Sequence, residues 1–226
     1  MTAGRMVYCM SYPIPKYRRE DTPRQRGEKR RASGSWQAKL NRLKSSEKLE
    51  QLIYCNFGPG DWFLTLTYRD GCLPARRARV MEDVRAFRRR LSELRRQRGA
   101  PLCYIYTMEH KSSGGRWHVH MVLRGTGPAD LQEIRESWRK GHVHAQRFEL
   151  GQGEALAAYL AKEAPDYVGE HPWIASRGLR RPEVDSRLVS DADRLAVPPG
   201  AVIRTQESRT NSYGRFEYVK YFLPQL

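Results

Sequence analysis

Two histidines in alternating positions of an apolar run are the residues of this chain most suited to chemistry. The run covers residues 115–123 and reads GRWHVHMVL. Successive side chains of a β-strand point to opposite faces, so His118 and His120 share one face while Val119 and Met121 share the other. Neutral imidazole is a common ligand for divalent metals. The pair therefore indicates a metal site, and the alternative is a half-buried strand with two hydrogen-bonded histidines.

A carboxylate is expected beside this pair. The apolar stretch 102–108 is followed by a polar turn, Ser-Ser-Gly-Gly at 112–115, so the two strands should form a hairpin that brings Glu109 toward His118. Two nitrogens and one hard oxygen, with positions left open for water and phosphate oxygens, suit Mg²⁺ or Mn²⁺, and zinc is chemically possible. Such an ion would act as a Lewis acid on a scissile phosphate.

A tyrosine and a lysine follow on a helix expected over residues 152–163. Tyr159 and Lys162 are three residues apart and so lie on one helix face. A tyrosine hydroxyl titrates near pH 10, so it is a poor nucleophile unless a cation or a metal-bound phosphate stabilises its oxyanion. Lys162 could supply that charge or protonate a leaving 3′ oxygen. Alone, the pair is weak evidence, because such residues are usually a packed ring and a solvated amine.

The chain contains a second His-Val-His sequence, His142 to His144. It lacks the hydrophobic continuation of the first pair, and no hairpin carboxylate is expected next to it. We therefore prefer His118 and His120 as the metal ligands. His110 and His171 are expected in surface or loop positions.

Composition favours a nucleic-acid partner. Lys and Arg total 41 against 25 Asp and Glu, which gives a formal charge of +16 and a pI near 10.0. The four cysteines are widely spread, without a CxxC pair, as expected for free thiols in a reducing compartment. No apolar run approaches the roughly 20 residues that span a bilayer. We therefore expect a cytoplasmic protein that does not associate with membranes.

The elements that would position these residues predict an α+β fold, with one largely antiparallel central sheet and packed helices. In chain order we expect a helix at 35–54, a strand at 62–68, a helix at 80–94, strands at 102–108 and 117–123, a helix at 130–139, a strand at 143–148 and the helix at 152–163. The principal domain should span 35–182. It should follow a flexible basic arm at 1–34 and precede an extension at 183–226, with a β-hairpin at 202–207 and 215–222.

Three segments together resemble a known family. Residues 63–68 (FLTLTY), 116–121 (RWHVHM) and 159–162 (YLAK) are similar, in their order, to motifs 1, 2 and 3 of the HUH endonucleases, and most of all to single-tyrosine replication-associated (Rep) proteins. The resemblance implies an HUH/ferredoxin-like fold and cleavage of single-stranded DNA through a covalent 5′-phosphotyrosine. It implies these roles: His118 and His120 as metal ligands, Glu109 as the third ligand, Tyr159 as nucleophile, Lys162 as assisting cation, and Thr65, Thr67, Arg116 and Arg177 at the DNA.

The motif 3 helix implies a one-tyrosine mechanism. Ala155 and Leu156 occupy the turn before Tyr159, where two-tyrosine members have their other tyrosine, and Tyr167 lies beyond Pro165. The favoured function is initiation of rolling-circle replication of a plasmid, phage or integrated element, with Mg²⁺ or Mn²⁺ as cofactor. Alternatives are a transposase or relaxase with the same chemistry, or a non-enzymatic nucleic-acid-binding domain, which would normally present aromatic residues on its sheet.

The expected partner is single-stranded or hairpin origin DNA. No P-loop ending in Gly-Lys-Ser/Thr is visible in the sequence. We therefore expect unwinding and synthesis to come from a separate host helicase and polymerase.

Overall fold

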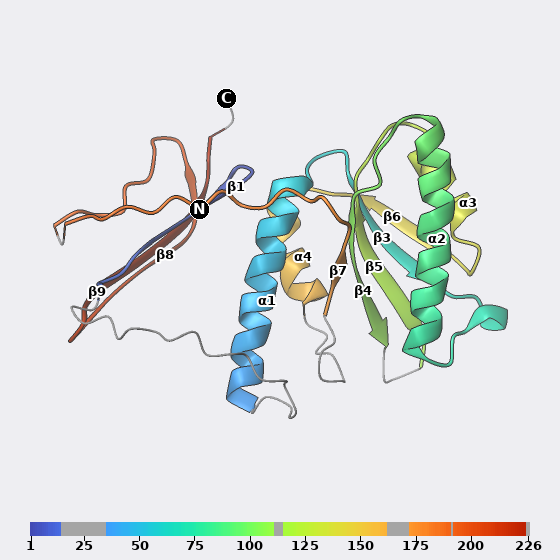
Figure 1. Ribbon diagram of the computed structural model, residues 1–226, viewed down its shortest axis with the longest axis horizontal. Coiled ribbons are helices and arrows are strands. Elements are labelled where there is room, and N and C mark those ends of the chain that lie inside the picture. Colours follow the sequence, from blue (N-terminus) through green and yellow to red (C-terminus); the bar gives the residue numbers. More distant parts are fainter. Residues whose placement is uncertain (15–34, 111–114, 162–171, 191, 225–226) are drawn as a thin grey trace. The chain divides into compact units, whose positions relative to one another are not determined.

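A computed structural model describes residues 1–14, 35–110, 115–161, 172–190 and 192–224, without the side chains of residues 35–40, 42 and 150 (Figure 1). The chain divides into two compact units, one of residues 32–179 and one of residues 1–31 with 180–226. The fold is α+β, as predicted: the described residues form four α-helices and two antiparallel sheets. None of the described helices is long and apolar enough to cross a bilayer.

The larger unit is built on a five-stranded sheet with the order β6-β3-β5-β4-β7. Its strands are β3 (Trp62–Thr67), β4 (Tyr104–His110), β5 (Trp117–Leu123), β6 (Val143–Arg147) and β7 (Ile174–Ala175). β4 and β5 pair as the predicted hairpin, and β5 lies at the centre between β4 and β3. The short strand β7, which pairs with β4, was not predicted.

Helices cover both faces of this sheet (Figure 1). The face that carries Leu66 and Met121 packs against α2 (Arg77–Gln97) and α3 (Asp130–Ser137), in a core that includes Phe87, Ile134 and Trp138. The other face carries Phe63, Ile105 and Val122. It packs against apolar residues of α1 (Ser35–Asn56) and α4 (Gly153–Leu160), namely Leu49, Ile53, Leu156, Ala157 and Leu160. Two single-turn 3₁₀ helices, η1 (Asp70–Cys72) and η2 (Leu150–Gln152), lie in the connections.

A buried ion pair joins α2 to the start of α3. Arg95 and Asp130 are both fully buried, and the Arg95 Nη2 donates to Asp130 Oδ1 at 3.0 Å. The carboxylate also accepts from the Thr126 backbone and hydroxyl and from the Trp62 indole. Burial alone would raise the pKa of Asp130, but the hydrogen bonds from Thr126 and Trp62 and the charge of Arg95 outweigh it and hold the pKa below its usual range.

The smaller unit is a four-stranded sheet with the order β1-β2-β9-β8. Its strands are β1 (Thr2–Ala3), β2 (Met6–Ser11), β8 (Val202–Asn211) and β9 (Gly214–Phe222). Val7, Val219 and Tyr221 form its buried cluster. β8 and β9 confirm the predicted terminal hairpin and extend it to Asn211 and Gly214.

The prediction of a flexible arm is wrong for residues 1–14. Met6–Ser11 pairs along its whole length with β9, from Met6 opposite Phe222 to Ser11 opposite Glu217. Local composition suggested an arm because the partner strand lies some 200 residues away and its backbone hydrogen bonds leave no local signal. Residues 15–34, which include most of the basic positions of that arm, lie outside the described residues.

The Arg95–Asp130 pair generates a stability prediction. Asp130→Asn should lower the free energy of unfolding by about 3–5 kcal/mol, because it leaves a buried guanidinium without its counter-charge. The folded pKa of Asp130 is lowered, so its contribution to stability is complete above the unfolded value of about 3.9 and is lost as pH falls through the folded value. Urea unfolding of both proteins across acidic pH measures the two effects.

Glu93→Gln is the matched control, since its partner Arg96 is exposed and such pairs contribute about 1 kcal/mol or less. An Asp130→Asn protein no less stable than Glu93→Gln would contradict the role given to the buried pair.

Candidate active site

Strand register places the predicted ligands in one row across the sheet. Glu109 of β4 and Thr67 of β3 are the direct neighbours of His118 on either side. In the next row along the strands, Thr65 and Thr107 flank His120 in the same way. All these side chains lie on the sheet face that α1 and α4 cover elsewhere. The expected hairpin contact between Glu109 and the histidine strand is therefore present.

His120 is held by hydrogen bonds on both ring nitrogens. Its Nδ1 lies 3.1 Å from the Thr65 hydroxyl and its Nε2 lies 2.9 Å from Glu109 Oε2. An ionised carboxylate only accepts hydrogen bonds, so Nε2–H donates to Glu109 and Nδ1 accepts from Thr65. The Phe63 ring stacks on the imidazole at 6.1 Å between centroids. His120 is buried and its orientation is fixed, whereas His118 is half-buried and stacks beside it.

Tyr159 completes this arrangement from α4. Its hydroxyl donates to Glu109 Oε2 at 3.0 Å and lies 2.9 Å from His120 Nε2. The phenol oxygen, the carboxylate oxygen and the imidazole nitrogen therefore form a nearly equilateral triangle, here named the Tyr-His-Glu triangle. The Tyr159 side chain is 39% exposed, so a ligand can reach its hydroxyl from solvent.

The position of α4 depends on its close packing against α1. Leu156 and Leu160 are buried in the core that includes Leu49 and Ile53 of α1. A Cβ atom on Gly153, the first residue of α4, would lie only 2.6 Å from the buried ring of Tyr54. Glycine therefore lets α4 lie near α1 and bring Tyr159 over the histidine strand.

The donor set fits a divalent metal of the magnesium type. Neighbouring ligands of an octahedral ion with bonds of about 2.1 Å are about 3 Å apart, which is the separation of His120 Nε2 from Glu109 Oε2. His118 supplies a second imidazole on the same face. In the part of the chain that the structure describes, no three His, Cys, Asp or Glu side chains already have the arrangement of a metal site. Binding by this set therefore requires side-chain rotation.

The second histidine pair lies on the same sheet face. β6 is the edge strand next to β3, and Thr65 is paired with His144 on one side and with His120 on the other. His144 is exposed, and its Nε2 lies 2.9 Å from the Gln146 amide. Sequence reasoning set this pair aside without predicting that it shares a face with the first. Glu109, on the far side of β5, contacts His120 and Tyr159.

The remaining predicted residues are more scattered. The Thr67 hydroxyl donates to the His142 carbonyl at 3.4 Å, and Arg116 forms an exposed ion pair with Asp70. Arg177 is exposed in the turn after β7. No described contact joins Arg116 or Arg177 to the Tyr-His-Glu triangle. Lys162, Tyr167 and His171 lie outside the described residues.

Sequence reasoning missed one residue of this face. Thr107 is buried next to His120, and its hydroxyl donates to the Pro172 carbonyl at 2.7 Å, so it ties the segment before β7 to the sheet. Its position two residues before Glu109, on the same strand face, was the signal that could have identified it.

Comparison with known proteins gives one match. Residues 61–165 match the model of a family of replication-associated proteins, the ORF2 family. The matched range runs from the start of β3 through α4 and so includes every residue of the Tyr-His-Glu triangle. No curated protein and no solved structure matches the chain.

The choice between the two histidine pairs can be tested by metal binding alone. We expect Mn²⁺ at about 100 times its Kd to stabilise the wild-type protein by about 2.7 kcal/mol, because the ion binds the folded state. His118→Ala and His120→Ala should lose this gain, and His144→Ala should keep it. Thermal melts with and without Mn²⁺ provide the measurement. If His144→Ala abolishes the gain while His118→Ala keeps it, the ion binds at β6 instead.

Proposed function

With the match of residues 61–165 to the replication-associated ORF2 family as the premise, we propose that this chain nicks and joins single-stranded DNA during phage or plasmid replication. The reaction forms a covalent bond between Tyr159 and a 5′ phosphate and initiates rolling-circle replication. One observation carries the proposal: the Tyr159 hydroxyl, from α4, donates to Glu109 and touches His120 on the central strands. A solvent-accessible phenol beside a carboxylate and an imidazole is suited to nucleophilic attack.

The cleavage step uses these atoms directly. The Tyr159 oxygen attacks the phosphorus, the bond between phosphorus and the 3′ oxygen breaks, and the 5′ phosphate remains on Tyr159. The phenol proton leaves along the existing hydrogen bond to Glu109 Oε2, and the 3′ oxygen takes up a proton as it departs as a hydroxyl. Attack of a 3′ hydroxyl on the phosphotyrosine reverses these steps and joins the strands, because a phosphodiester bond is exchanged at each stage.

A divalent ion fits this scheme at His118, His120 and Glu109. When bound, Mg²⁺ or Mn²⁺ polarises a phosphate oxygen and stabilises the charge that develops in the transition state. A carboxylate has two oxygens, so Glu109 can ligate the ion through one and accept from Tyr159 through the other. Thr65 holds the His120 ring in place through Nδ1.

Further roles rest on the sequence. Lys162, three residues after Tyr159, is proposed to stabilise the phenolate or to protonate the leaving oxygen. Thr67, Arg116 and Arg177 are proposed to contact the DNA strand, of which Arg116 and Arg177 are exposed cations suited to phosphate.

The central experiment is adduct formation. Wild-type protein incubated with Mn²⁺ and a labelled single-stranded oligonucleotide should give a complex that survives denaturation, and Tyr159→Phe should give none because it lacks the attacking oxygen. Tyr167→Phe is the matched control and should form the complex normally. Denaturing gels quantify the product. Adduct from Tyr159→Phe, together with none from Tyr167→Phe, would assign the nucleophile to the other tyrosine.

Thr65→Val tests the support of His120. The change removes the hydroxyl bonded to Nδ1 and keeps the side-chain shape, so cleavage should slow by about 10- to 100-fold, as for other partners of metal-ligating histidines. Thr67→Val, whose hydroxyl reaches only a carbonyl at 3.4 Å, should stay within about threefold of wild type. Single-turnover rates across a Mn²⁺ titration measure both variants. Equal rates for Thr65→Val and wild type would remove Thr65 from the account.

A further inference from the structure

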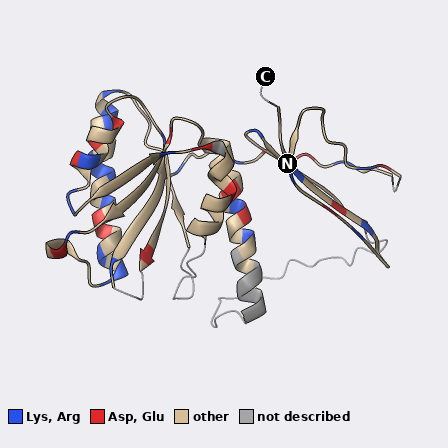
Figure 2. Cartoon of the chain, turned by 180° about the vertical axis from the view of Figure 1, so that it is seen from behind, with Lys and Arg blue, Asp and Glu red and all other residues tan. Residues whose placement is uncertain are grey.

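Helix α2 carries arginines in excess of what its ion pairs require (Figure 2). Those near its ends have partners: Arg79 pairs with Glu82, and Arg96 pairs with Glu93. Arg95 is paired with Asp130, and Arg90 donates to the Ser137 carbonyl. In the middle of the helix, Arg85, Arg88 and Arg89 form no ion pair with any described carboxylate.

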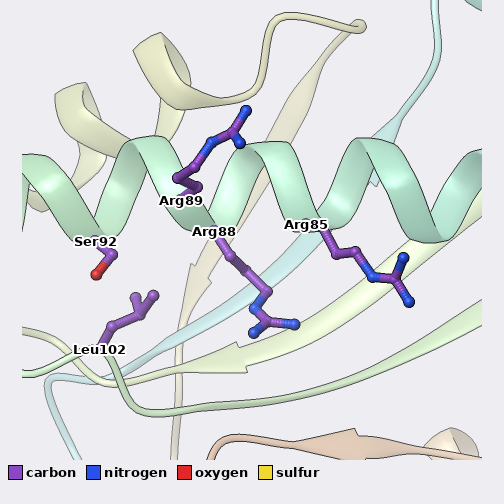
Figure 3. Close-up of a pocket in the computed structure, with 5 residues that line it drawn as sticks. All are labelled: Arg85, Arg88, Arg89, Ser92 and Leu102. Atoms are coloured by element: carbon purple, nitrogen blue, oxygen red, sulfur yellow. The ribbon is translucent and has the colours of Figure 1, made fainter.

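These three arginines line a hollow in the protein surface. The hollow has a volume of about 250 Å³, and Ser92 and Leu102 complete its lining (Figure 3). Positions 85, 88, 89 and 92 follow the spacing of one helix face. Three guanidinium groups held side by side repel one another, so an anion bound between them would be stabilised by all three.

Arg88 is held in a defined orientation within this hollow. Its guanidinium lies over the ring of Tyr104 at 4.4 Å, which is a cation–π contact. Its Nε is buried without a hydrogen-bond partner in the described structure. Burial raises the pKa of Tyr104, so that phenol stays neutral and does not cancel the positive charge of Arg88. The hollow therefore presents a preoriented cation between two more mobile ones.

Phosphate is the anion that this chemistry fits best. Guanidinium groups bind phosphate oxygens through paired hydrogen bonds, and a serine hydroxyl is also a common phosphate donor. Arg85 and Arg89 are separated by about 6 Å along the helix, so together they present a line of charge rather than a single point. The formal charge of +16 for the whole chain favours a polyanion over a lone phosphate.

We propose that the arginine hollow binds the phosphate backbone of DNA that extends beyond the strand at Tyr159. This inference rests on the proposed function, which supplies the DNA. α2 packs on the sheet face opposite to His118 and His120, so the sheet separates the hollow from the Tyr-His-Glu triangle. Only DNA long enough to pass around the edge of the sheet can occupy both sites.

The test compares DNA of two lengths. The double variant Arg85→Gln/Arg89→Gln changes two exposed side chains and leaves the buried contacts of Arg88 in place. It should bind a fluorescent single strand of about 40 nucleotides at least about tenfold more weakly than wild type, with a salt dependence reduced by about 0.7 for each phosphate that is no longer neutralised. A strand of about 10 nucleotides should bind both proteins equally. Fluorescence anisotropy across a salt series gives both quantities.

Arg79→Gln/Arg96→Gln is the matched control, because these arginines lie on the same helix and are already paired with carboxylates. It should bind the long strand within about threefold of wild type. All affinities are measured in proteins that also carry Tyr159→Phe, so the result does not depend on cleavage.

Two results would overturn the proposal. One is equal affinity and equal salt dependence of the two double variants for the long strand. The other is an unchanged DNA affinity together with lost binding of an aspartate-rich peptide, which would make the hollow a docking site for an acidic protein. Nicking of short strands is measured separately, so failure here leaves the role of Tyr159 untouched.

Discussion

The alternation of side chains along paired antiparallel strands is the constraint on which the whole site depends. It places Glu109, His118 and His120 on one face of the sheet, and a shift of one residue in the β4–β5 register would move the carboxylate to the opposite face. The same face must also receive α4, since Tyr159 reaches His120 and Glu109 only from there. Packing of α4 on α1, with Gly153 against Tyr54, thus has a direct chemical consequence.

The opposite face has a different role. α2 and α3 close a continuous apolar core over it, and the buried Arg95–Asp130 pair fixes how the two helices meet. Because this layer holds the central strands from behind, the histidine face can remain partly open to a ligand. The outward side of α2 is then free to carry exposed charge, and the arginine hollow lies there. Chemistry and backbone binding are in this way assigned to separate layers of one small unit.

Local patterns predicted much of this arrangement. Period-two alternation identified β5, and the polar turn at 112–115 predicted the hairpin that brings Glu109 to His118. The patterns could not show which distant strands pair. β2 joins β9 across nearly the whole chain, and β6 lies beside β3, which puts His144 on the same face as His120. The contact of Tyr159 with His120 was likewise beyond prediction, because it depends on how two helices pack on the sheet. The metal and the roles of Lys162 and Arg177 stay predictions.

The most direct measurement of the account is the identity of the residue that becomes linked to DNA. After reaction with a single-stranded oligonucleotide and nuclease trimming, tryptic peptides can be sequenced by mass spectrometry. Cleavage at Arg147, Lys162 and Arg177 places Tyr159 and Tyr167 in different peptides, 148–162 and 163–177. The account predicts a nucleotide phosphate on Tyr159 in the first peptide. A phosphate adduct on Tyr167 in the second peptide, with the first unmodified, would contradict it.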